Sequence, residues 1–237
     1  MNRRIPWGRP AAVAAALLLT ACGQVHPGAA ATVGDSRISF DEVDTLSVAY
    51  CKATLADAEA RGEPVPAAEG MDSRRTVLQA LLVLELSRQA ADKLGVEVEP
   101  AAYAADEQSI QSLVDAVGEE YADEIDRLIE VFGEAGALQA EIGADQLDQE
   151  VSEADVAAQQ EAGRRYVGDY AADVEIDIDP RLGLSSDVDA LFATGTLPVA
   201  SSTGSLSVPV SDEAVLPDDD AAAADAIAEL PSTQVCA

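Results

Sequence analysis

The side chains best suited to chemistry in this chain of 237 residues are three cysteines, Cys22, Cys51 and Cys236, and one histidine, His26. Nucleophilic catalysis by serine or cysteine normally needs a histidine held beside the nucleophile. His26 lies in a short segment near the N-terminus, before the first predicted element, so the usual Ser-His-Asp and Cys-His systems are excluded. No two cysteines have Cys-x-x-Cys spacing, which leaves redox catalysis and a zinc-ribbon site without support.

Cys22 follows an N-terminal segment with the three parts of an export signal. Met1–Pro10 carries three arginines and no acid, Ala11–Leu19 is purely apolar, and Leu-Thr-Ala precedes the cysteine. This order predicts a signal peptide over residues 1–21. The four residues ending at Cys22 resemble the bacterial lipobox, whose cysteine thiol receives a diacylglycerol before cleavage. An ordinary secretory signal with a stray cysteine is the alternative.

A lipidated Cys22 predicts an extracytoplasmic protein that is attached to the outer face of the cell membrane. Fatty acyl chains such as palmitate contribute about 0.8 kcal/mol per buried CH₂, so two or three chains suffice as an anchor. Residues 22–31 are then expected to be a tether. The longest later apolar run, Val77–Leu86, contains Gln79 and Glu85 and predicts a buried helix instead of a membrane span.

The other two cysteines form an even pair in what would be an oxidising compartment. We therefore predict a disulfide between Cys51 and Cys236 that ties the C-terminal tail to the first helix. Two free thiols are the alternative, because the sequence does not show whether the two Cα atoms come within bonding range.

Charge and composition exclude several functional classes. The chain has 44 acidic and 14 basic residues and a formal charge of −30, so nucleic acid is excluded as a partner. No dinucleotide-binding or P-loop glycine pattern is present, and Asp218–Asp220 lacks the glycine-pivoted loop of a calcium site. We predict no cofactor and no metal. Aromatic residues make up 4%, and the abundance of alanine favours helices.

Hydrophobic periodicity and capping residues predict the elements. Ser39 and Glu42 form a capping box that starts the first helix, and Gly95 is placed to end the second. The inner face of the fourth helix is expected to consist of Tyr121, Ile125, Leu128, Ile129 and Phe132. Gly133, Gly136 and Gly143 predict a short or broken helix after it. The expected helices cover residues 40–60, 73–94, 100–117, 119–132, 135–142 and about 152–170.

Two short strands are expected at the ends of this helical region. Thr32–Ile38 is a strand and turn with Gly34-Asp35 at its tip, and Val174–Ile178 alternates acidic and apolar residues. Residues 32–183 are thus predicted to be one domain, and residues 184–237 a low-complexity acidic tail.

This arrangement resembles the SurA N-terminal domain family of extracytoplasmic folding factors, in particular lipoprotein members from actinobacteria. The resemblance covers residues 30–183, including Asp179-Pro180-Arg181-Leu182-Gly183 after the second strand. It implies a mainly α fold in which a two-stranded β element joins the ends of the domain. It also implies a chaperone-like protein that binds unfolded or exported polypeptides without ATP. Residues 181–237 contain no histidine, so a parvulin-type prolyl isomerase domain is not supported.

Three functions therefore stay open: the chaperone-like role, a non-catalytic scaffold that binds one folded partner, and prolyl isomerisation as the least supported. The most apolar predicted helix carries Leu78, Leu81 and Leu82, which are candidates for lining a groove for client peptides. The alternative is that these leucines belong to the core, where burial of each side chain would contribute about 1.5–3 kcal/mol without any client. The pattern predicts no particular oligomeric state.

Overall fold

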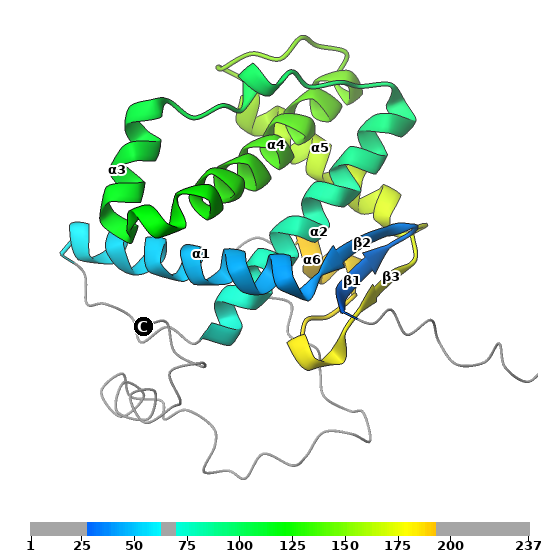
Figure 1. The fold of residues 1–237 in the computed structure, drawn as a ribbon. Coiled ribbons are helices and arrows are strands. Elements are labelled where there is room, and N and C mark those ends of the chain that lie inside the picture. The colour runs from blue at the N-terminus through cyan, green and yellow to red at the C-terminus, as the bar shows by residue number, and fades with distance from the viewer. Residues whose placement is uncertain (1–27, 63–69, 193–237) are drawn as a thin grey trace, which may run out of the picture.

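The computed structural model of the chain describes residues 28–62 and 70–192, and Figure 1 shows them as a set of helices beside one small sheet. Within these ranges the protein is mainly helical, as the composition predicts. None of the helices in this part combines the length and apolar character that a membrane span needs. The predicted signal peptide, Cys22 and the residues after 192 lie outside the described part.

The N-terminal half of the sheet is a hairpin. β1 (Ala29–Val33) pairs with β2 (Ser36–Ser39), and the turn between them contains Gly34 with a φ of +57°. Glycine adopts this left-handed conformation without steric cost. The sheet therefore has three strands and not the expected two, because Thr32–Ile38 contains two strands and their turn. The first strand also begins within the predicted tether, since Ala29 already pairs with β2.

The third strand comes from the other end of the domain. β3 (Ile176–Ile178) pairs antiparallel with β1, so that Ile178 lies opposite Ala31. The strand order is β2-β1-β3. Pairing continues beyond the strand, because the backbone N–H of Asp179 donates to the carbonyl of Ala30 over 2.9 Å. The predicted junction between the two ends of the domain is thus confirmed.

The first helix begins where its capping residue predicts. α1 (Phe40–Ala60) has Ser39 as N-cap, and the Ser39 hydroxyl accepts from the backbone N–H of Glu42 over 3.1 Å. The second bond of the expected capping box, from the Ser39 N–H to the Glu42 side chain, is absent. The Glu42 carboxylate instead pairs with Arg127 of a later helix at 3.2 Å. The pair adds a long-range contact between two helices.

α2 (Gly70–Leu94) is the central helix, and it contacts α1, α4, α5 and the sheet. It starts before the predicted cap, so Asp72 lies inside its first turn and pairs there with Arg75 at 3.0 Å. Gly95 follows the helix with a φ of +70°, as predicted. Six branched aliphatic side chains of α2 are buried in the core: Val77, Leu78, Leu81, Leu82, Leu84 and Leu86.

The third predicted helix is divided. Pro100–Ala102 forms one 3₁₀ turn, and α3 (Glu107–Val117) begins only after Asp106. The Asp106 carboxylate caps the new helix, because it accepts from the backbone N–H of Ser109 over 2.9 Å. The Asp106 cap starts the helix later than Pro100, which was the predicted start because proline favours the first helical position.

The prediction of a broken helix at 135–142 is wrong. After a 3₁₀ turn at Glu119–Tyr121, α4 runs without interruption over Ala122–Gln146 and packs antiparallel to α5 (Val156–Ala171). Figure 1 shows α5 crossing α4 near the C-terminal end of α4. Of the three glycines that predict a break, Gly133 lies against Tyr103, and Gly136 and Gly143 face α5 at the contact between the two helices.

Two glycines permit that contact. A Cβ on Gly143 would lie 1.7 Å from the backbone oxygen of Gln159, and a Cβ on Gly163 would lie 1.8 Å from the backbone oxygen of Gln139. Any side chain at either position would collide with main-chain atoms, which cannot rotate away. The separation of α4 and α5 therefore depends on these two residues having no side chain.

The chain stays packed on the helices beyond the predicted domain boundary at residue 183. Pro180–Leu182 forms a 3₁₀ turn, and α6 (Val188–Phe192) packs against α2 and α5. The Arg75 guanidinium of α2 donates to the Leu182 carbonyl over 2.9 Å. The expected tail at 184–237 thus begins later, because residues 184–192 belong to the described fold.

The glycine contact can be tested with two alanine substitutions on α5. Gly163→Ala should destabilise the protein by about 1–3 kcal/mol or more, because the added methyl forces the α4 and α5 backbones apart. Gly168→Ala is the matched control, since its Cβ would meet nothing closer than Phe192 at 3.9 Å. Better helix propensity should make this control neutral or stabilise it by up to about 1 kcal/mol. Chemical unfolding measures both, and equal effects would contradict the packing explanation.

A second test concerns acid stability at the end of the sheet. The Asp179 carboxylate accepts from the Arg181 backbone N–H at 2.9 Å and from its guanidinium at 2.8 Å. These hydrogen bonds, above all that from the Arg181 side chain, lower the pKa of Asp179. The folded pKa lies below the unfolded one, so the carboxylate's stabilisation is complete above the ordinary value near 3.8 and is lost as the pH falls through the folded pKa.

Asp179→Asn should therefore lower the free energy of unfolding by about 0.5–1 kcal/mol at neutral pH, since solvent screens the exposed Arg181. The difference from the wild type should shrink as the pH falls below about 4. Asp177→Asn, which removes an exposed charge two residues earlier, serves as control. A difference for Asp179→Asn that is the same at neutral and at strongly acidic pH would rule out the proposed titration.

Candidate functional site

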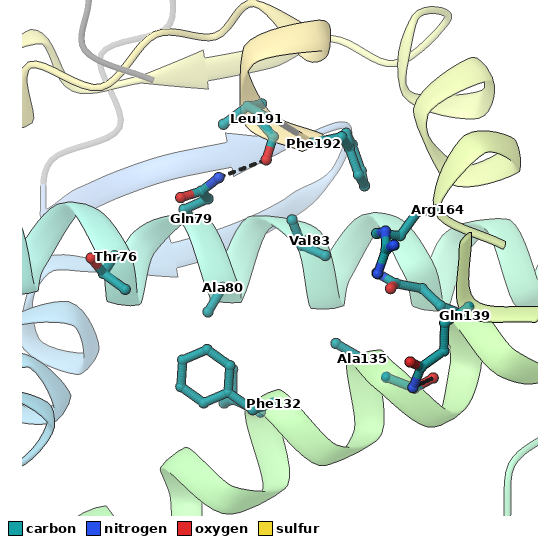
Figure 2. Close-up of a pocket in the computed structure, with 13 residues that line it drawn as sticks. Thr76, Gln79, Ala80, Val83, Phe132, Ala135, Gln139, Arg164, Leu191 and Phe192 are labelled. Carbon is teal, nitrogen blue, oxygen red and sulfur yellow. Dashed lines mark hydrogen bonds between the residues drawn. The ribbon is translucent and has the colours of Figure 1, made fainter. Parts of the chain in front are cut away.

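A pocket of about 310 Å³ lies between α2, α4, α5 and α6. Figure 2 shows α2 along one wall, Phe132 of α4 directed toward it, and Leu191 and Phe192 of α6 on the opposite side of α2. We refer to this space as the α2/α4 pocket. Its residues come from four helices that span most of the described sequence, so only the folded chain forms it.

The walls of the α2/α4 pocket are mainly apolar. α2 contributes Ala80 and Val83, and α4 contributes Val131, Phe132 and Ala135. Short side chains on both helices leave the space open, whereas the larger leucines of α2 face the core. Such a lining favours burial of an apolar group, at about 25 cal/mol per Å² of apolar surface.

Phe132 is the most unusual residue of this lining. Its side chain is 46% exposed, although it is large and apolar. Its ring lies 6.1 Å from that of Tyr50 on α1, at an interplanar angle of 32°. Periodicity placed Phe132 on the inner face of its helix, but the neighbouring Val131 is the residue that is fully buried. Phe132 instead offers apolar surface at the edge of the pocket.

Amide side chains supply most of the polar groups. Gln79 donates to the backbone carbonyl of Leu191 over 2.7 Å, and Gln160 donates to the carbonyl of Gly136 over 3.3 Å. Gln139 and Thr76 also line the space. Both bonded amides have a main-chain carbonyl as their acceptor. The pocket thus already contains the type of contact that would hold a polypeptide backbone.

The charge of the pocket differs from that of the protein. None of the acidic side chains in the described residues lines it, although the chain has 44 of them and a formal charge of −30. The one charged residue of the lining is Arg164, whose guanidinium pairs with Glu161 one turn earlier on α5. The pocket therefore offers apolar contact, amide hydrogen bonds and one positive charge.

Two contacts fix α4 beside α2 next to the pocket. Arg88 of α2 donates to Glu134 of α4 over 2.6 Å, and this hydrogen bond raises the pKa of Arg88 above its ordinary value. The second contact joins Gly133 of α4 to Tyr103. The two residues are so close that a Cβ on Gly133 would come within 2.9 Å of the Tyr103 carbonyl oxygen. Both contacts are made by the two residues that directly follow Phe132, and they help to position it.

The structure places the predicted peptide-binding leucines in the core. Leu78 and Leu82 are fully buried and Leu81 is 5% exposed, and none of the three lines the α2/α4 pocket. α2 presents Thr76, Gln79, Ala80 and Val83 to the pocket instead. The burial of these leucines supports the alternative, which is that they belong to the core. The sequence contains no pattern that would have identified these four pocket residues of α2.

Cys51, the cysteine within the described residues, is not part of the pocket lining. Cys51 is buried on α1 and is disulfide-bonded. Cys236, its predicted partner, lies outside the described residues, as does the predicted lipidation site Cys22. The pairing of Cys51 with Cys236 and the lipidation of Cys22 therefore stay predictions.

A second hollow, between α1 and α3, is acidic where the α2/α4 pocket is not. Its lining includes Asp57 and Asp106 together with Ser109 and Ser112. The Asp106 carboxylate is engaged by Ser109, whose hydroxyl donates to it and lowers its pKa. Across residues 28–62 and 70–192, no three His, Cys, Asp or Glu side chains gather in a way that could hold a metal ion. The α2/α4 pocket is therefore the better candidate site.

Comparison of the chain with protein-family models, curated proteins and solved structures finds no match. Its function must be argued from its own residues.

Proposed function

We propose that this protein is a chaperone-like lipoprotein, anchored to the outer face of the cell membrane, that binds unfolded or exported polypeptides without ATP. The observation that carries the proposal is the α2/α4 pocket, a mainly apolar space to which residues 28–62 and 70–192 contribute no carboxylate, in a strongly acidic protein. An acidic surface keeps the protein soluble, and the pocket supplies apolar surface for a client.

The lining chemistry suits an unfolded segment better than a small polar substrate. Phe132 is exposed at the pocket edge, where an incoming apolar side chain can pack on its ring. Gln79 and Gln160 bond main-chain carbonyls, which are present in every polypeptide whatever its sequence. Apolar contact combined with backbone hydrogen bonding would give weak, broadly selective binding.

We further propose that the helical domain belongs with the SurA N-terminal domain family. The pairing of β1 with β3 supports this kinship, because the resemblance implies strands from the two ends of the domain lying side by side. Had Val33 and Ile176 been far apart, the resemblance would have lost its main structural feature. The hairpin of β1 and β2 adds a strand to the expected pair.

The proposed binding role predicts a specific loss on substitution of Phe132. Phe132→Ser should weaken suppression of the aggregation of a chemically unfolded client such as citrate synthase, followed by light scattering. The concentration needed for half-suppression should rise about tenfold, since truncation of an aromatic contact at a binding surface commonly costs more than 1 kcal/mol.

Leu147→Ser is the matched control. Leu147 is also large, apolar and 41% exposed, but it follows the C-terminal end of α4 and is not part of the pocket lining. Thermal melts of both variants exclude unfolding as the cause. Equal suppression by both variants and the wild type would contradict the assignment of the pocket, and no suppression by the wild type at excess would contradict the chaperone-like role.

The proposed location predicts that the thiol of Cys22 is required for membrane attachment. Cys22→Ala should prevent lipid addition, so the protein should lose the mass of the acyl chains and move from the membrane fraction to the soluble extracellular fraction. Globomycin, which blocks the lipoprotein signal peptidase, should leave a longer precursor in the membrane. Unchanged mass and unchanged membrane retention of the Cys22→Ala variant would refute the anchor.

A further inference from the structure

α6 packs against the helices with the spacing of a bound amphipathic helix. Val188, Leu191 and Phe192 occupy positions i, i+3 and i+4, which lie on one face. Leu191 is 1% exposed, and Val188 and Phe192 are half-buried against the core. Partner helices that bind in apolar grooves use the same spacing of anchor residues.

The same residues that line the α2/α4 pocket also hold α6. Leu191 and Phe192 form part of the lining, and the Gln79 amide is bonded to the Leu191 carbonyl. Figure 2 shows this bond crossing from α2 to α6, with Phe192 directed toward the side of α5 that carries Arg164. α6 therefore covers one side of the pocket, across α2 from Phe132.

In the described part of the chain, α6 depends on its packing against α2 and α5. It has five residues, and a helix this short does not form by itself in water. It is connected to the rest of the domain through Gly183 in the left-handed conformation and through residues 184–187. Local elements of this kind open at a lower free energy than the core does.

We propose that α6 is a built-in occupant of the client groove, and that a client segment with apolar residues at positions i, i+3 and i+4 displaces it. This inference rests on the proposed function, and it specifies the client as an amphipathic helical segment. Gln79 would transfer its hydrogen bond from the Leu191 carbonyl to a carbonyl of the client. Because α6 is part of the chain, it competes at all times and lowers the apparent affinity for clients.

The experiment uses the full chain and a fluorescent peptide with the sequence of residues 184–192, followed by anisotropy. Leu191→Ser should bind the peptide at least about tenfold more tightly than the wild type, because a docked α6 leaves 10% or less of the wild type competent to bind. A peptide with serine at the positions of Leu191 and Phe192 is the matched control probe and should not bind.

Two further variants keep the test decisive. Phe192→Ser removes a half-buried side chain of α6 and should also increase affinity, which provides a second test if Leu191→Ser fails to fold. Gln79→Arg, added to Leu191→Ser, places a long charged side chain where α6 packs on α2 and should abolish the gain. Retention of the gain in this double variant would show that the peptide binds elsewhere and would overturn the inference.

Failure of the inference can be distinguished from failure of the proposed function. If the wild type, Leu191→Ser and Phe192→Ser bind the peptide equally, α6 is not an occupant of the groove but the groove still binds polypeptide. If none of them binds the peptide and the wild type does not suppress aggregation, both proposals fall.

Hydrogen exchange tests the displacement itself. Addition of the peptide to the wild type should increase exchange of the backbone amides of residues 188–192, because α6 leaves its position on α2. Unchanged or slower exchange of these amides in the peptide-bound protein would overturn the displacement. Amides of the buried part of α2 serve as an internal control and should not change.

Discussion

The pairing of β3 with β1 determines where the C-terminal part of the described chain runs. Backbone N–H and C=O groups of a buried strand must be satisfied, and β3 supplies partners along the edge of β1 that the hairpin leaves open. The Asp179 N–H extends this pairing to Ala30, so the chain enters the 3₁₀ turn directly over α2. There Arg75 binds the carbonyl of Leu182 and, one helical turn later, Gln79 binds that of Leu191. A sheet of a few residues thus brings α6 to the pocket.

The α2/α4 pocket owes its shape to the close contact of α4 with α5. Because Gly143 and Gly163 have no side chains, the two backbones approach closely, and Gln160 can reach the carbonyl of Gly136 on the facing helix. Gly133 and the Arg88–Glu134 pair then hold the N-terminal part of α4 near Tyr103 and α2. Wider spacing at the glycines would move the lining residues of α4 and α5 relative to α2, so packing far from Phe132 controls the geometry around it.

The sequence predicted structural features that depend on neighbouring residues. It did not predict features that depend on contacts with residues distant in the chain. The cap at Ser39 and the left-handed Gly95 depend on a few neighbouring residues, and both were predicted. The glycines of α4 predict a break because the residues that they contact, on α5 and at Tyr103, are distant in sequence. Helical periodicity predicts Phe132 in the core, because it shows which side of a helix is apolar but not how many residues of that side are buried. α6 is too short for a periodic signal, although its Val188, Leu191 and Phe192 spacing could have indicated it.

The contrast between an acidic protein and a pocket free of carboxylates separates two steps of binding. Charges attract a basic segment over roughly one Debye length, about 8 Å at physiological ionic strength, and this attraction mainly raises the rate of encounter. Retention would depend on Phe132 and the apolar walls, which salt does not screen, and on the ease with which α6 leaves. Carboxylates in the lining would have to be desolvated by every apolar client, at a cost of several kcal/mol each. No described carboxylate lines the pocket, and Arg164 at its edge is paired with Glu161. For an apolar client, the main obstacle to burial in the proposed site would therefore be the docked α6.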